Sequence, residues 1–390
     1  MNAAPVPLTD NRPAAVPQGA AHTHREIRQQ PRLWAEMVTR LSAERPALDA
    51  FLAPLLADPR LRIVLTGAGT SAYAGQIARS ALAAATGRTV EALATTDIVA
   101  DPTGCFEERT RPTLLVSFAR SGGSPESAAA TELADQLLDH CAHLVITCND
   151  RGALAVRHGE RTDSYVLLTP AEAEDQGFAM TSSLTCMLLA ALHTLGADRV
   201  PGLDACAASA EALLAEDVTG RVAALTRVEH QRFVYLGSGA LKALAGESAL
   251  KLLELTGGAV TALADSSLGF RHGPKAFLSG RTGVVVYISN DPYTRRYDLD
   301  IFNELTAALP AGHVVAVAGK PEGLPEAATW LVPGMAEADD AALALPAVLY
   351  AQLLALDASL ACGVTPDNPF PDGEVNRVVQ GVTVHPFTTC

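Results

Sequence analysis

The sequence predicts an α/β protein with two tandem domains, each a parallel sheet between two helical layers, that arose by internal duplication. Short apolar runs alternate with helical segments, as is typical of parallel sheets covered on both faces. The turns 67–69 and 237–239 have the form Gly-x-Gly, follow such runs and lie 170 residues apart, so that two glycine pairs share this offset. The stretches 143–145 and 313–315, His-Leu-Val and His-Val-Val, repeat at the same offset. Three coincident offsets favour a duplication over chance.

Composition limits the possible functions. The 390 residues are 48% apolar and 18% charged, which suits a sizeable core and excludes a disordered chain. The net charge of −14 disfavours nucleic acid or an anionic membrane as a partner but permits a small anionic substrate. No uninterrupted run of 18 apolar residues and no signal peptide are present. Seven dispersed cysteines without metal-ligand spacing predict reduced thiols and a cytoplasmic protein, and we expect neither a metal nor a cofactor.

The predicted organisation runs in five parts. These are a loose tail (1–22), N-terminal helices (23–60), a first sheet domain (61–204), a linker helix with a second sheet domain (205–365) and a C-terminal tail (366–390). In the N-terminal part, one helical face carries Leu33, Trp34, Met37, Val38 and Leu41. The linker helix is expected to be continuous over about 205–227. The predicted strands are 62–66, 113–118, 143–148, 231–236, 283–289 and a run starting at 313.

A serine- and glycine-rich loop in the first domain has the features of an anion site. It reads Ala-Arg-Ser-Gly-Gly-Ser over 119–124 and lies between a predicted strand and a helix that starts at Pro125. Glycines let backbone N–H groups converge on a ligand, and a helix N-terminus adds unpaired donors. Ser121, Ser124 and, from the first turn, Ser71 supply hydroxyls. The alternative is that Ser124 or Ser127 only caps the helix.

The second domain lacks an equivalent loop, because Asn-Asp-Pro-Tyr over 290–293 stands in its place. The sequence therefore predicts one phosphate-type site in each chain. A dinucleotide fold is disfavoured, since the turn 67–72 lacks the third glycine of GxGxxG.

A predicted helix of the second domain carries an ordered set of charges. Glu247, Lys251 and Glu254 are spaced i, i+4 and i+7 and share one face, while the opposite face is Ala- and Leu-rich. An exposed salt-bridged stripe is the alternative. Downstream, His272 lies in a loop with Arg271 and Lys275; a surface position is the alternative for this histidine. A carboxylate and a histidine near a phosphate loop form a suitable acid–base set for a sugar phosphate.

These motifs, with Phe-Ala-Met-Thr-Ser-Ser over 178–183, Gly-Phe-Arg-His-Gly-Pro over 269–274 and Pro-Asp-Asn-Pro-Phe-Pro over 366–371, resemble the sugar isomerase (SIS) family of phosphosugar domains over residues 24 to 387. The tandem arrangement is similar to the isomerase half of glucosamine-6-phosphate synthase. The subgroup it resembles most is the AgaS type, which comprises galactosamine-6-phosphate deaminase/isomerases and tagatose-6-phosphate ketose/aldose isomerases. The resemblance implies two tandem SIS domains.

The resemblance also implies residue roles. Glu254 matches the base that moves a proton between C1 and C2, and His272 matches a histidine that assists ring opening from the partner subunit. Glu247 and Lys251 match charged residues bordering the sugar. The implied phosphate site contains Ser71, Arg120, Ser121 and Ser124, although Arg120 stands where the synthase has glutamine and Ala119 where it has serine. The implied sugar site contains Gly69, Thr70, Ala179, Met180 and Thr181.

One departure from the synthase concerns nitrogen. The synthase tail holds the ketose through a lysine imine, whereas residues 366–390 contain no lysine, and no glutaminase domain precedes the first strand. We therefore expect a deaminating isomerase of a hexosamine 6-phosphate, with galactosamine 6-phosphate as substrate and a homodimer as the minimal assembly. The alternatives are a tagatose-6-phosphate isomerase, a glucosamine-6-phosphate deaminase, a fructosamine-phosphate deglycase and a phosphosugar-sensing regulator.

Overall fold

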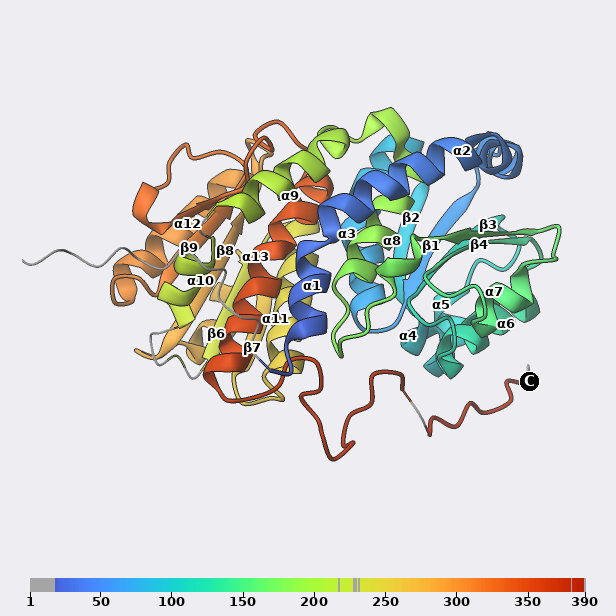
Figure 1. Ribbon diagram of the computed structural model, residues 1–390. Coiled ribbons are helices and arrows are strands. Elements are labelled where there is room, and N and C mark those ends of the chain that lie inside the picture. Colours follow the sequence, from blue (N-terminus) through green and yellow to red (C-terminus); the bar gives the residue numbers. More distant parts are fainter. Residues whose placement is uncertain (1–17, 217, 227–229, 231, 380, 389–390) are drawn as a thin grey trace, which may run out of the picture.

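The computed structural model describes residues 18–216, 218–226, 230, 232–379 and 381–388, and two lobes lie side by side in it (Figure 1). Lobe one contains a five-stranded parallel sheet in the order β2-β1-β3-β4-β5. Its strands are β1 (Arg62–Gly67), β2 (Thr89–Ala94), β3 (Thr113–Ala119), β4 (Cys141–Thr147) and β5 (Ser164–Leu168). Its helices are α3 (Thr70–Thr86), α4 (Thr95–Ala100), α5 (Pro102–Cys105), α6 (Pro125–Leu137), α7 (Ala153–His158) and α8 (Ser182–Ala191).

Lobe two contains a second five-stranded parallel sheet, in the order β10-β9-β8-β6-β7. Its strands are β6 (Arg232–Gly237), β7 (Thr261–Ser266), β8 (Thr282–Ile288), β9 (Val314–Ala318) and β10 (Thr329–Leu331), and its helices are α11 (Ala240–Leu255) and α12 (Thr294–Ala308). Counted along the chain within each lobe, the strand order is the same in both sheets, 2-1-3-4-5. Two helix-flanked parallel sheets were predicted, and this part of the fold prediction is confirmed.

The remaining helices join the lobes. They are α1 (Ala21–Arg28), α2 (Gln30–Ala57), α9 (Cys206–Ala215), α10 (Val218–Thr226) and α13 (Asp340–Ala361). The predicted face of α2 is largely correct, because Leu33, Trp34, Met37 and Leu41 are buried and Val38 is half-buried against them. One apolar cluster contains residues from both sheets and from these helices, so the lobes share a core.

Three predictions about elements need correction. The linker is not one helix: α9 ends at Ala215, where the extended backbone of Glu216 interrupts it before α10. The predicted tail is helical from Ala21 onward, and its first 17 residues lie outside the described part. Four strands were missed, namely β2, β5, β7 and β10. Each pairs along one side only, and many of their side chains are half-exposed, which weakens the apolar signal.

The helices α3 and α11 run antiparallel across the boundary between the lobes. Thr70 at the start of α3 contacts Glu247 in the second half of α11, whereas Ser80 lines a pocket with Gly239 at the start of α11. Between them, the Tyr73 ring lies against Gly246. This crossing places the carboxyl end of α11 beside the amino end of α3.

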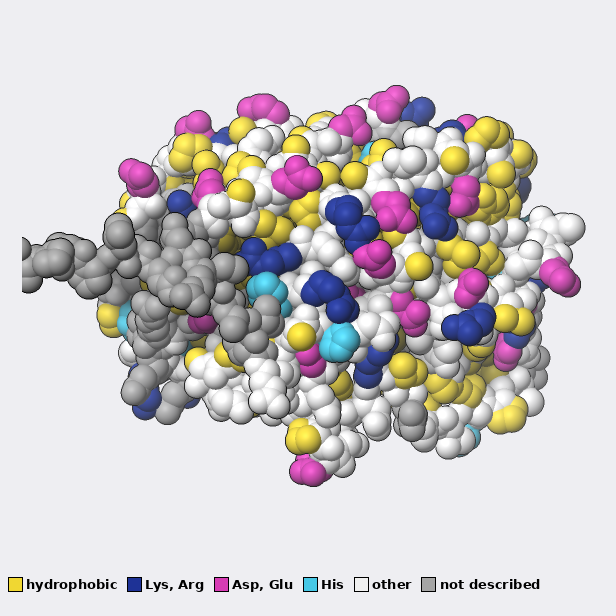
Figure 2. Space-filling model, viewed as in Figure 1, with side chains coloured by type: hydrophobic (Ala, Val, Ile, Leu, Met, Phe, Trp, Pro, Cys, Tyr) yellow, Lys and Arg dark blue, Asp and Glu magenta, His cyan; other side chains and the backbone are white. Residues whose placement is uncertain are grey.

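Helix α13 is the one helix among the described residues that is long and apolar enough to cross a membrane by length and composition. However, 94% of its apolar window is buried inside the protein, as expected of a core helix. At the surface, the described residues on the face shown in Figure 2 carry intermixed basic and acidic side chains rather than one basic patch.

The strand-to-helix glycines predict a measurable backbone constraint. A Cβ on Gly237 would lie 2.5 Å from the Leu241 carbonyl oxygen, whereas one on Gly280 would meet nothing within 4 Å. We expect Gly237→Ala to lower the free energy of unfolding by about 1–3 kcal/mol, because backbone atoms must shift. Gly280→Ala should change it by less than about 0.5 kcal/mol. Urea denaturation of both variants measures this, and equal stabilities would contradict the prediction.

Candidate active site

The serine–glycine loop follows β3 and leads into α6. Gly122 adopts a positive φ of 63°, and its carbonyl oxygen accepts a hydrogen bond from Leu154 N at 3.0 Å. The Ser121 hydroxyl accepts one from Gly123 N at 3.3 Å. Ser124 precedes α6 without a side-chain cap bond; its hydroxyl contacts that of Ser127 at 2.6 Å. The Ser124 hydroxyl therefore does not cap α6, and the capping alternative for this residue is wrong. The loop backbone is fixed by its hydrogen bonds to Leu154 and to the Ser121 hydroxyl.

The first glycine turn, residues 67–69, follows β1, which is the neighbour of β3 in the sheet. Gly69 has a φ of 55° and immediately precedes α3, on which Thr70 and Ser71 are buried. The Ser71 hydroxyl lies 3.9 Å from the Met180 sulfur, which brings a predicted phosphate residue beside a predicted sugar residue. Because β1 and β3 are adjacent and parallel, the amino ends of α3 and α6 lie at the same edge of the sheet. Two helix N-termini with hydroxyl side chains suit an anionic group.

The charged face of α11 is buried rather than exposed to solvent. Glu247 and Lys251 are fully buried, and the Glu254 side chain is 26% exposed. The Lys251 ammonium pairs with the Glu254 carboxylate and lies 3.5 Å from that of Glu247. The Thr70 hydroxyl donates to Glu247 Oε1 at 3.4 Å, so lobe one closes directly on this cluster. The exposed-stripe alternative is wrong.

Burial changes the acid strength of these groups. It raises the pKa of Glu247 to about 7, with the Lys251 ammonium opposing the shift. For Lys251, burial acts to lower the pKa, but the two carboxylates outweigh it and the pKa is raised. Glu247 Oε2 is buried without a hydrogen-bond partner among the described residues. The site therefore contains an ammonium group whose charged form is favoured, beside a carboxyl group whose pKa is about 7.

Asp175 fixes the backbone of residues 178–183, the predicted sugar segment. This residue was not identified from the sequence. The Asp175 carboxylate accepts hydrogen bonds from the backbone N–H groups of Thr181, Ser182 and Ser183 and from the Thr181 and Ser183 hydroxyls. The Thr181 hydroxyl is thus engaged with Asp175. The carboxylate lies at the amino end of α8, where it is favourable. Its position six residues before Thr181 is outside the usual capping spacing, which explains why no motif indicated it.

A second buried carboxylate, Glu26 of α1, holds the preceding residues. Its oxygens accept hydrogen bonds from Gln176 N at 2.6 Å and Gly177 N at 3.1 Å. Burial and the Asp175 charge raise the pKa of Glu26. Ala179 is buried within the segment and Met180 is half-buried. The N-terminal helices therefore help to fix the backbone that carries the predicted sugar residues.

Arg120 begins the serine–glycine loop and is 7% exposed. Its Nη1 donates to the Phe178 carbonyl at 3.2 Å, and its Nη2 donates to the Arg377 carbonyl at 2.7 Å. Burial lowers the pKa of Arg120, while the charges of Asp175 and Glu254 oppose this effect. The guanidinium therefore connects three segments that are distant in sequence.

His272, in contrast, has no hydrogen bond or ion pair with the other predicted site residues of its own chain among the described residues. It is exposed between two short 3-10 turns (Gly269–Arg271 and Pro274–Phe277), and the flanking Arg271 and Lys275 pair with Glu304.

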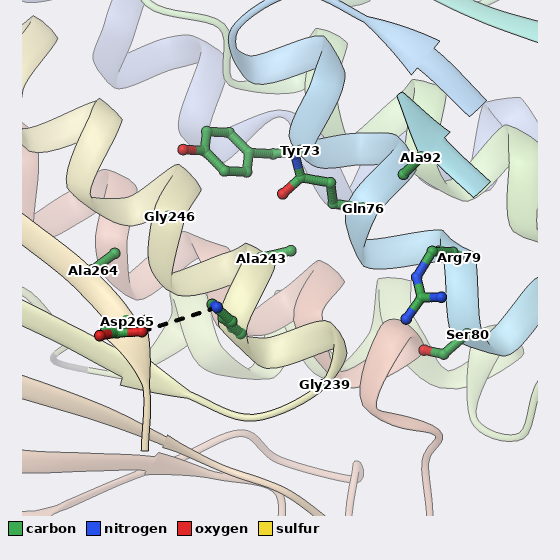
Figure 3. A pocket seen from close by; sticks show the side chains of 11 residues that line it. Tyr73, Gln76, Arg79, Ser80, Ala92, Gly239, Ala243, Gly246, Ala264 and Asp265 are labelled. Carbon is green, nitrogen blue, oxygen red and sulfur yellow. Dashed lines mark ion pairs between the residues drawn. The ribbon is translucent and has the colours of Figure 1, made fainter. Parts of the chain in front are cut away.

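A separate pocket of about 430 Å³ lies between α3 and α11, beside the edge strands β2 and β7 (Figure 3). Tyr73, Gln76 and Arg79 approach it from α3, and on the opposite side Lys242 of α11 pairs with Asp265 of β7 at 3.9 Å. None of the predicted site residues lines this pocket. Among the described residues, no group of three His, Cys, Asp or Glu side chains could hold a metal ion.

The raised pKa of Glu247 predicts a pH-dependent stability. Folding lifts this pKa from about 4.5 to about 7, so the ionised form is less stable in the folded chain than in the unfolded chain. The penalty is absent below about pH 4, grows as the pH rises through the two pKa values, and is almost fully present above pH 7. We therefore expect the stability of Glu247→Gln, measured relative to that of the unmodified chain, to rise by about 1–3 kcal/mol from pH 5 to pH 8.

Urea denaturation across this pH range measures the difference. Glu304→Gln is the control, because the Lys275 and Arg271 charges lower the pKa of Glu304 and its removal should give no such gain. A flat difference for Glu247→Gln would contradict the prediction.

Comparison with known proteins identifies the family. The SIS domain model matches residues 55–195. The AgaS protein of Streptomyces coelicolor is 60% identical and covers 95% of this chain and 97% of its own length. The D-galactosamine-6-phosphate deaminase AgaS of Escherichia coli is 44% identical, covering 96% and 98%. The crystal structure of tagatose-6-phosphate ketose/aldose isomerase from Escherichia coli superposes with a TM-score of 0.87 at 42% identity, covering 97% and 100%. The chain therefore belongs to the sugar isomerase (SIS) family, in its AgaS group.

Proposed function

We propose that this protein is a deaminating aldose–ketose isomerase that converts D-galactosamine 6-phosphate to tagatose 6-phosphate and ammonia. The observation that carries the proposal is the buried Glu247–Lys251–Glu254 cluster, which lies against the first glycine turn through the Thr70–Glu247 contact. The named substrate of the Escherichia coli relative supports the choice of sugar. Anion donors and acid–base groups lie side by side, as a phosphorylated sugar requires.

In the proposed mechanism, Ser71, Ser121, Ser124 and the α3 and α6 N-termini bind the phosphate, and the Arg120 charge favours it from the edge of the loop. Residues 178–183, together with Gly69 and Thr70, border the sugar. Binding energy obtained at the phosphate then positions the reacting carbons against α11.

The proposed proton transfers require one carboxylate. Glu254 takes the proton from C2 of the open-chain amino aldehyde while O1 gains a proton from water, giving an enaminol. Glu254 then returns its proton to C1, and the amino group loses one to water. The resulting ketimine at C2 adds water and breaks the C–N bond, releasing ammonia and the ketose. Lys251 holds the Glu254 carboxylate in place through their ion pair. Glu247 borders the sugar on the buried side of Lys251.

The proposed assembly is a homodimer in which His272 of one subunit assists ring opening in the other. The exposed position of His272, away from its own chain's cluster, supports this arrangement. We further propose that the two lobes arose by duplication and that the protein acts in the cytoplasm. We also propose the five predicted parts as its domain organisation, except that the N-terminal helices begin at Ala21 rather than at residue 23. The equal strand order of the two sheets supports the duplication.

The second candidate is isomerisation of tagatose 6-phosphate without loss of nitrogen, which the name of the Escherichia coli structure favours. A panel of galactosamine 6-phosphate, glucosamine 6-phosphate and tagatose 6-phosphate, assayed for ammonium and for ketose or aldose, separates the two. Ammonium from galactosamine 6-phosphate supports our proposal. Interconversion of tagatose 6-phosphate with no ammonium from either amino sugar would refute it.

Removing the proposed base should separate catalysis from binding. We expect Glu254→Gln to lower kcat by about 10²–10⁴-fold, because the C2 proton then has no acceptor. The dissociation constant for galactosamine 6-phosphate should stay within about threefold by calorimetry, since the phosphate contacts remain. Glu211→Gln, on the exposed face of α9, should change neither quantity. Parallel loss of binding and turnover would assign Glu254 a structural role.

Mixed dimers test the origin of the histidine. Glu254→Gln and His272→Ala chains, each nearly inactive alone, should regain roughly a quarter of the unmodified activity after subunit exchange at equal amounts. In the mixed dimer one site combines an intact Glu254 with an intact His272 of the partner subunit. If each chain used its own His272, no site would be complete and no activity would return.

A further inference from the structure

The C-terminal arm, defined as residues 366–379 and 381–388, crosses from lobe two along lobe one toward α6 (Figure 1). It has no helix or strand, and most of its residues are exposed. At its start, the Asp367 carboxylate accepts hydrogen bonds from His22 N, Thr23 N and the Thr23 hydroxyl. Near its end, the Phe387 carbonyl accepts a hydrogen bond from Gln136.

Between these two points the arm contacts the site. The Phe370 ring lies 5.1 Å from the Phe178 ring, measured between centroids. Arg377 donates from Nη1 to the Gln176 carbonyl at 3.3 Å, and its own carbonyl accepts the bond from Arg120. Among the described residues of 371–386, these are the hydrogen bonds that join the arm to the rest of the chain. The arm therefore rests on the residues that begin the sugar segment.

Arg120 has the geometry needed to hold all three segments together. Its two terminal nitrogens donate to carbonyls of the sugar segment and of the arm, while its backbone begins the serine–glycine loop. A planar guanidinium can make two divergent bonds in a fixed orientation, whereas a lysine ammonium acts as a point charge. The side chain is almost fully buried, so loss of either acceptor would leave a buried charged donor unpaired.

We propose that Arg120 is a positioning residue that fastens the C-terminal arm across the sugar segment, so that the docked arm determines how tightly the site holds its ligand. Arg120 then acts through the Phe178 and Arg377 carbonyls. The sequence indicated only that arginine replaces the glutamine of the synthase.

Limited proteolysis tests the docking without reference to activity. Arg377 is the one lysine or arginine in residues 366–390, so trypsin can cut this region only there and release 378–390. We expect Arg120→Gln to speed this cleavage by about tenfold, because proteolysis follows the population of the open form. Mass spectrometry of the intact chain measures the rate.

Arg295→Gln is the matched control. Arg295 is also 7% exposed and donates to main-chain carbonyls, but these are Ser289, Lys320 and Glu322 of lobe two. Its replacement should leave the cleavage rate at Arg377 unchanged. An unchanged rate in Arg120→Gln, or equal acceleration in both variants, would overturn the proposal.

Arg120→Lys covers the case in which the glutamine variant does not fold. It retains the charge but lacks the two separate terminal nitrogens from which Arg120 donates, so cleavage at Arg377 should still be faster than in the unmodified chain. A rate equal to that of the unmodified chain would show that charge alone is sufficient, and would also overturn the proposal.

The effect on ligand binding rests on the proposed function and is tested by a double-mutant cycle. Arg120→Gln and a chain ending at Asn376 should each raise KM for galactosamine 6-phosphate more than they lower kcat. Combined, they should raise KM by less than the product of the two separate factors, because both remove the Arg120–Arg377 contact. Additive effects would overturn the link between Arg120 and the arm. An unmodified chain without turnover would instead refute the proposed function and leave the proteolysis result standing.

Discussion

The constraint on which the site depends is the burial of an ammonium group between two carboxylates on one helix. Lys251 is fully enclosed, and an isolated charge there would be strongly unfavourable. Glu247 and Glu254, one helical turn before and after it, compensate the charge. Burial of this cluster requires lobe one to close over α11, and the start of α3 does so through Thr70. The same Thr70–Glu247 contact therefore joins the two lobes and encloses the charged cluster.

The same contact explains why two lobes of equal topology carry different chemistry. In lobe one, two glycine turns place helix N-termini and hydroxyls at the carboxyl edge of the sheet. In lobe two, Asn290 lies in the corresponding loop and donates to the Met335 and Ala338 carbonyls. Its side chain therefore joins this loop to the segment before α13. Lobe two contributes the carboxyl end of α11, which the antiparallel crossing places beside the turns of lobe one.

The sequence predicted those parts of the fold and site that local pattern determines. Central strands such as β3 are buried along their whole length and read as apolar runs, whereas the edge strand β2 has mostly half-exposed side chains and was missed. The charges of α11 were identified by helical spacing. Asp175 was not, because it lies six residues before Thr181, outside the usual capping spacing. The Arg377 carbonyl was not, because it contacts Arg120 across a separation of 257 residues. No spacing rule carries that information.

The arm also relates to the direction of the proposed reaction. A synthase that adds nitrogen must hold its ketose while ammonia arrives, and a covalent imine from the tail suits that need. An enzyme that releases ammonia benefits from a cover that opens readily, because ketose and ammonia must both leave. The hydrogen bonds to the Arg377 and Gln176 carbonyls and the aromatic contact of Phe370 provide a reversible attachment. An arginine at position 120 and an arm without lysine are thus consistent with each other and with the deaminating direction.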